Sequence, residues 1–112
     1  YLTEICKIHL NYMCKEFAER LGSKVHKITL RDTRSRWGSC SNDAKLMFSW
    51  RLVMAPEDVL AYVAAHEVAH LKHMNHSKDF WETVEYLFGP YTKERAWLKQ
   101  NGSTLHRYKF ES

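Results

Sequence analysis

The residues best suited to chemistry lie in one short segment, His66-Glu67-Val68-Ala69-His70. Two histidines four residues apart fall on one face of an α-helix, one turn from each other. Their imidazoles can therefore reach one metal ion at about 2 Å from each ligating nitrogen. Glu67 is offset around the helix, so its carboxylate can reach a water at the metal without binding the ion itself. This spacing is typical of a zinc hydrolase with Glu67 as the general base.

A catalytic zinc ion needs a third protein ligand and one open position. We expect His76 to be that ligand, because the chain can turn back at the junction between two predicted helices. His73 is the rival ligand, but on a continued helix it lies a further turn away and outside tetrahedral reach. Glu82 or Glu85, on the following helix, ranks third. The sequence therefore predicts one Zn²⁺ ion, held by three histidines.

Helices are expected on both sides of this segment. Proline is favoured at the first helical position, and acidic residues such as Glu57 and Asp58 suit the first turn. Serine is a common helix cap, whereas a Gly-Pro pair breaks a helix. Three helices are predicted on these signals: Pro56 to Lys72 or His73, Ser77 to the Gly89-Pro90 break, and Thr92 to Gln100.

The first half of the chain predicts one helix and a small sheet. Apolar residues on one face indicate a helix over Thr3–Leu21. Alternating apolar residues indicate strands at Val25–Leu30 and Leu46–Trp50, and turn residues suggest that Trp37–Cys40 pairs with Lys45–Ser49 as a hairpin. The expected fold class is α+β. About three mostly antiparallel strands pack on the N-terminal helix and the HExxH helix, and two C-terminal helices follow.

The composition fits one small domain. The chain has 112 residues, of which 45% are apolar and 27% charged, and no apolar run reaches the roughly 20 residues of a membrane helix. The three cysteines are odd in number and irregularly spaced, which indicates a reducing, cytoplasmic compartment rather than a disulfide framework. Because the chain begins at Tyr1, we expect residues 1–112 to be a single domain that lacks some N-terminal residues.

Two other functions compete with the peptidase hypothesis. Four arginines, whose planar guanidinium groups suit phosphates, favour a metal-dependent nucleoside triphosphate pyrophosphohydrolase: Arg31, Arg34, Arg36 and Arg51. The formal charge of +4 permits a nucleotide or DNA partner without requiring one. The second alternative is a non-catalytic zinc module that binds protein or DNA. Structural zinc usually has four Cys or His ligands, however, and such a site does not need Glu67.

Several motifs, in a fixed order along the chain, carry a resemblance to a known family: Arg34–Ser41, Trp50–Pro56, Tyr62-Val63, His66–Leu71 and Asn75–Trp81. The region from about Arg31 to Gly102 resembles the YgjP-like metallopeptidase family and, more distantly, the SprT and WLM zinc peptidases. This resemblance implies a zincin-like fold, zinc on His66, His70 and His76, and a catalytic Glu67. It also implies a peptide or unfolded protein as the substrate.

Two positions depart from the pattern of that family, which usually has Gly in place of Ala44 and Asn in place of Ser49. Ala44 lies in a predicted turn, and Ser49 lies in a predicted strand beside the expected cleft. In zincins a sheet edge holds the extended substrate by main-chain pairing, a role that either strand of the predicted hairpin would serve. Three basic side chains are candidates for binding substrate or stabilising the oxyanion: Arg51, His73 and Arg36.

Overall fold

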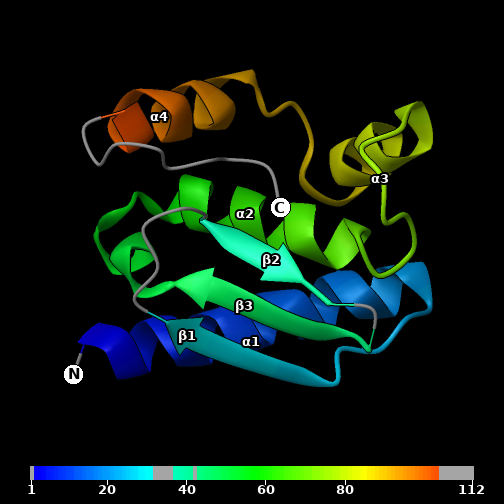
Figure 1. Cartoon of the computed structure of the whole chain (residues 1–112), viewed down its shortest axis with the longest axis horizontal. Helices are drawn as coiled ribbons and strands as arrows, with labels where there is room; N and C mark the ends of the chain where they lie inside the picture. The colour runs from blue at the N-terminus through cyan, green and yellow to red at the C-terminus, as the bar shows by residue number, and fades with distance from the viewer. Residues whose placement is uncertain (1, 32–36, 42, 104–112) are drawn as a thin grey trace.

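A computed structural model describes residues 2–31, 37–41 and 43–103. Within these ranges it confirms the expected α+β class and the order of the elements (Figure 1). The elements are α1 (Leu2–Leu21), β1 (Lys27–Arg31), β2 (Gly38–Cys40), β3 (Lys45–Ser49), the short 3₁₀ helix η1 (Trp50–Met54), α2 (Glu57–Ala69), α3 (Lys78–Phe88) and α4 (Thr92–Ser103).

The sheet has three strands in the order β1-β3-β2, and it is mixed rather than mostly antiparallel. The expected hairpin forms between β2 and β3, which pair antiparallel, but β1 pairs with β3 in parallel. The reason is the central place of β3, whose Leu46 and Phe48 are fully buried under the helices. Because β3 lies between the other two strands, it pairs with β2 on one side and with β1 on the other, and β1 runs in the same direction as β3.

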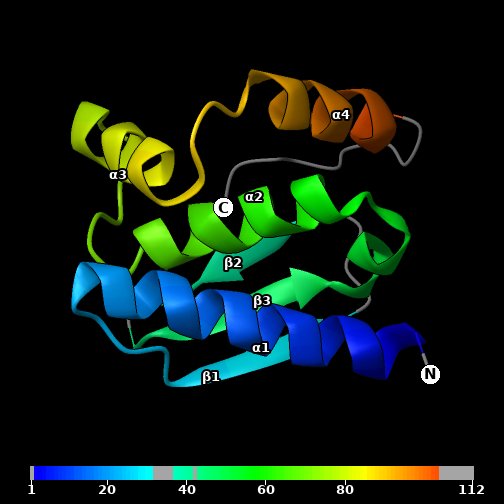
Figure 2. The ribbon, with the colours of Figure 1, turned by 180° about the vertical axis from the view of Figure 1, so that it is seen from behind.

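Helices α1 and α2 cover the same face of the sheet, α1 next to β1 and α2 next to β2 (Figures 1 and 2). Helix α2 lies at the centre of the molecule, and its residues from Tyr62 to Ala69 are all buried. Helices α3 and α4 pack on α2. No helix within the described ranges has both the length and the apolar character needed to cross a membrane.

Most helix ends follow the sequence signals. Helix α1 stops at Gly22, which adopts a left-handed φ of 70°, and the Ser77 hydroxyl accepts a hydrogen bond from the Phe80 amide at the start of α3. Several boundaries differ from the predicted ones: β1 is Lys27–Arg31 rather than Val25–Leu30, and α4 extends to Ser103 rather than to Gln100. Helix α2 ends at Ala69 rather than at residue 72 or 73, and Trp50 belongs to η1, not to β3. The Ser49 side chain caps η1 by accepting a hydrogen bond from the Arg51 amide, which ends the strand there.

Candidate metal centre

The predicted metal ligands come from the end of α2 and from the loop that follows it. His66 lies in the last turn of α2, and His70 is the residue that caps its C-terminus. The amides of residues 70–73 bond to carbonyls of residues 67–69 in tight turns, so the helix closes at this point. The chain then turns back, and His76 lies directly before α3.

These three imidazoles converge on one point. Their nearest ligating atoms all lie within 4.8 Å of one another, and their ring centroids are 4.9–5.4 Å apart. Among the described residues, no other histidine, cysteine or acidic side chain joins this group. The side chains of the rival ligands His73 and Glu82 instead border a hollow beside α3, and Glu85 is exposed.

The tautomer of His70 suits a metal ligand. Its Nδ1 lies 3.0 Å from the main-chain oxygen of His73, and because a carbonyl can only accept, Nδ1 carries the proton. The lone pair of Nε2 therefore remains for coordination. The Nε2 atoms of His70 and His76 are buried, and neither has a hydrogen-bond partner among the described residues. Buried polar atoms are normally bonded, so the Nε2 atoms of His70 and His76 fit ligands to a zinc ion.

The surroundings favour the neutral form of His66 and His70. Burial lowers the pKa of His66 well below its ordinary value of 6.5, and the neighbouring His70, His76 and Arg95 lower it further. Burial also lowers the pKa of His70, against the opposing effect of its bond to the His73 carbonyl. A neutral imidazole is the form that binds metal, so the site is prepared for an ion at neutral pH.

An aromatic shell surrounds the imidazoles, and the sequence analysis did not foresee it. The buried ring of Phe80 contacts all three: it stacks on His70 with centroids 4.4 Å apart and meets the other two edge-on at 5.0 Å. The Trp81 ring stacks on His76, with centroids 5.9 Å apart and planes 27° apart. The apolar stripe of α3 was visible in the sequence, but its contact with the histidines depends on how α3 packs against α2.

Glu67 is 1% exposed and turns toward β2 rather than joining the three ligands. A Cβ atom placed on Gly38 of β2 would lie 3.1 Å from the Glu67 carboxylate oxygen Oε2. The charge of this carboxylate contributes to raising the pKa of two thiols. Burial and then the charge of Glu67 raise the pKa of Cys14, and the same causes, followed by Asp43, raise the pKa of Cys40 to about 12. Glu67 is therefore buried where its charge reaches β2 and α1.

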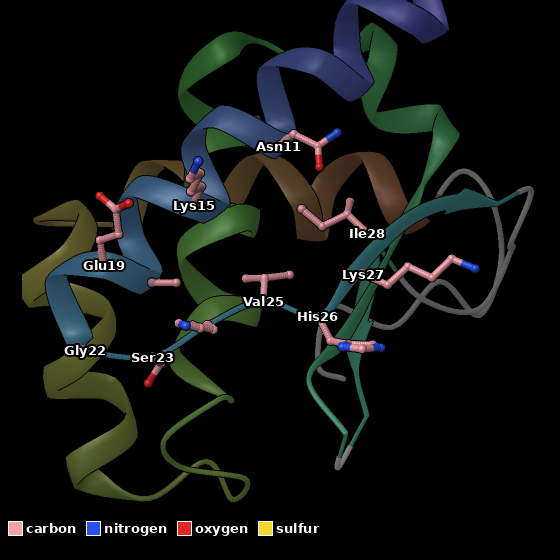
Figure 3. Close-up of a pocket in the computed structure, with 11 residues that line it drawn as sticks. Asn11, Lys15, Glu19, Gly22, Ser23, Val25, His26, Lys27 and Ile28 are labelled. Atoms are coloured by element: carbon pink, nitrogen blue, oxygen red, sulfur yellow. The ribbon is translucent and has the colours of Figure 1, made fainter.

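The four arginines of the phosphate hypothesis have separate surroundings where the structure describes them. Arg31 is exposed and borders a hollow on the side of the sheet, together with residues of β2 and β3. Arg51 lies in η1, with its guanidinium 5.7 Å from the Trp50 ring centroid. Arg34 and Arg36 lie outside the described residues. A further hollow, between α1 and the segment entering β1, holds none of the predicted site residues (Figure 3).

The fold and the converging imidazoles are those of a metallohydrolase. The chain belongs to the YgjP-like metallopeptidase family, whose domain model matches residues 1–101. The crystal structure of the metallopeptidase zymogen of Pyrococcus abyssi abylysin has a similar fold, with a TM-score of 0.71. The two chains share 20% identity over 88% of this chain and 97% of that chain. No curated protein matches significantly. The predicted class, a metallopeptidase, is thus confirmed.

Proposed function

We propose that this peptidase binds one zinc ion through His66, His70 and His76 and uses Glu67 as its general base. The observation that carries the proposal is the convergence of three buried or half-buried imidazoles at the end of the helix that also bears a buried carboxylate. Three protein ligands leave a fourth position open, as a catalytic zinc site requires. Bound zinc lowers the pKa of a water ligand to about 7 and polarises the scissile carbonyl.

Glu67 has the main proton-transfer role in this proposal. Its carboxylate accepts a proton from the attacking water and then delivers that proton to the nitrogen of the departing amine, so the carboxylate is restored. Its burial supports this role, because a carboxylate with few competing waters acts on the one water that the site admits. Sequence adjacency to His66 keeps it beside the ligands, although it is not one of them.

The edge of β2 is the proposed binding surface for the substrate main chain. Of the two strands considered from the sequence, β3 is paired on both sides, whereas β2 is an edge strand of the described sheet. Trp37 accepts a hydrogen bond from the Ser49 amide, and the Ser41 amide donates to the Lys45 carbonyl. Antiparallel pairs alternate, so Gly38 and Cys40 direct their N–H and C=O groups away from β3. Gly38 is buried, so the groups of the half-buried Cys40 are the ones that can pair with an extended peptide.

This binding mode favours an unfolded protein or a flexible peptide as the substrate. A peptide pairs with a sheet edge only when its own main-chain groups are available, and a folded helix or sheet does not offer them. The proposed location is the cytoplasm. All three cysteines are free thiols, which agrees with a reducing compartment.

The test compares the zinc-loaded chain with its Glu67→Gln variant on an unfolded protein and on nucleoside triphosphates. We expect the chain to cleave the protein and the variant to lose at least about 100-fold in kcat while it keeps zinc. Cleavage that survives in Glu67→Gln would overturn the role of Glu67. Triphosphate hydrolysis without proteolysis would favour the arginine hypothesis, and retained zinc with neither activity would favour a binding module.

A further inference from the structure

Gly38 lies where β2 packs against Glu67 of α2. A Cβ atom at this position would be 3.1 Å from both Cγ and Oε2 of Glu67, and 3.2 Å from the carbonyl oxygen of Met47. Ordinary contacts of a Cβ atom are wider than this, so a side chain here would press on the carboxylate from one side and on β3 from the other. The space that any other residue would fill is therefore occupied by the proposed general base.

The need for glycine at this position is steric and not conformational. The described glycines with a left-handed φ are Gly22 and Gly89, at 70° and 105°, and a Cβ on either would meet no atom within 4 Å. Gly38 is the reverse case: it lies within a regular strand that any residue can adopt, but it has no room for a Cβ. Its missing side chain thus serves the contact with Glu67.

We propose that Gly38 is a positioning residue for Glu67, and that its bare backbone sets the place of the carboxylate. This inference rests on the proposed role of Glu67. The Met47 oxygen cannot yield, because Met47 belongs to the central strand and is paired with residues on both sides. The backbone of α2 is buried throughout this region. An added methyl group would therefore be accommodated by rotation of the Glu67 side chain.

A small displacement of the carboxylate is sufficient to impair catalysis. Catalytic groups need to be held within about 0.5 Å of their productive position, and a misplacement of about 1 Å costs about 100-fold in rate. Gly38 packs against Glu67, which is not one of the metal ligands, so zinc affinity should not change. The proposal therefore predicts that kcat falls, whereas zinc affinity and the stability of the folded state change much less.

The test is a double-mutant cycle between Gly38→Ala and Glu67→Asp, measured on the zinc-loaded full chain with an unfolded protein substrate. We expect Gly38→Ala to lower kcat about 10-fold, with KM and the zinc dissociation constant within about twofold of the parent. Aspartate is shorter by one methylene group, so it lacks the Oε2 atom that the added methyl would meet, although it keeps Cγ. In the Glu67→Asp background the same substitution should therefore lower kcat by a smaller factor than it does in the parent. Equal losses in both backgrounds would overturn the proposal.

Gly22→Ala is the matched control, since it adds a methyl group that meets no neighbour but strains a left-handed residue. It should lower the melting temperature and leave kcat of the folded, zinc-loaded protein unchanged. Should Gly38→Ala fail to fold, the same substitution in a Glu67→Ala background decides the matter. Recovery of folding there supports the clash with Glu67, and failure in both backgrounds overturns it. Activity that survives in Glu67→Gln would instead reject the proposed function itself.

Discussion

The Nδ1 atom of His70 lies 3.0 Å from the main-chain oxygen of His73. This bond joins the residue that caps α2 to the end of the turn that follows. It fixes the proton on Nδ1 and directs Nε2 toward His66 and His76. His73 therefore contributes to the site through its backbone, although the sequence offered its imidazole as a rival ligand.

Substitution of His73 by Ala should leave zinc affinity within about twofold of the parent, because alanine retains the carbonyl oxygen that accepts from His70. His70→Ala removes a ligand and should weaken zinc binding by at least about 100-fold. A competition titration with a zinc chelator measures both constants. A large loss of zinc affinity in His73→Ala would indicate that its imidazole is a metal ligand.

The stability of the metal-free protein should fall as the pH decreases below about 6.5. Burial lowers the pKa of His66 and His70 in the folded state, so the unfolded chain binds more protons in this range. Stability therefore rises with pH. As the pH falls, stability is lost between the pKa of histidine in the unfolded chain and the lower pKa values of His66 and His70 in the folded protein. Thermal melts of chelator-treated protein at pH 5–7.5 test this. A double variant, His66→Gln with His70→Gln, should show a flatter profile, and an equally steep profile in that variant would contradict the assignment.

Trp81 should contribute to zinc affinity because its ring stacks on His76. The Nε2 atom of that imidazole has no hydrogen-bond partner in the part of the chain that the structure describes, and His76 comes from a loop, so its orientation depends on packing. We expect Trp81→Ala to weaken zinc binding about 10-fold and Trp81→Phe to preserve most of the affinity. Trp50→Ala is the control, because Trp50 is 41% exposed and lies in η1. A loss of the same size in both alanine variants would point to general destabilisation.

Ala44→Gly should stabilise the protein. Ala44 has a φ of 62° in the turn between β2 and β3, a conformation that costs a residue with a Cβ about 1 kcal/mol. Glycine adopts it without strain. We expect a rise of a few degrees in the melting temperature. Ala96→Gly, at an exposed position in α4, should have the opposite sign because glycine weakens a helix interior.

The local parts of the site were predictable from the sequence. Residues His66 and His70 share a helix, and their spacing alone brings them together. His76 was predictable because a helix cap follows it at Ser77, which the structure describes. The resemblance of the ordered motifs to the YgjP-like family was confirmed by the match over residues 1–101. The peptidase class followed from that resemblance rather than from spacing.

Non-local features were beyond the reach of sequence patterns. The parallel pairing of β1 with β3 joins residues across the whole hairpin, and no turn signal specifies it. The end of α2 carries neither Gly nor Pro. It depends instead on the hydrogen bond between the His70 side chain and the His73 carbonyl, which no local sequence signal indicates. Likewise, the approach of Gly38 to Glu67 results from the packing of β2 on α2, which no spacing along the chain reveals.

The six-residue step from His70 to His76 has a consequence for the folding of the C-terminal half. Helices α3 and α4 pack chiefly on α2, and Arg20 of α1 adds hydrogen bonds to the carbonyls of Tyr86 and Leu87. An ion held by both ends of the loop would therefore couple α3 to α2 as a cross-link does, since a ligand that binds only the native state stabilises it. Chelation should expose the amides of α3 and α4 to hydrogen exchange before those of β3. Equal rates of exchange in both regions would mean that the molecule opens as one cooperative unit.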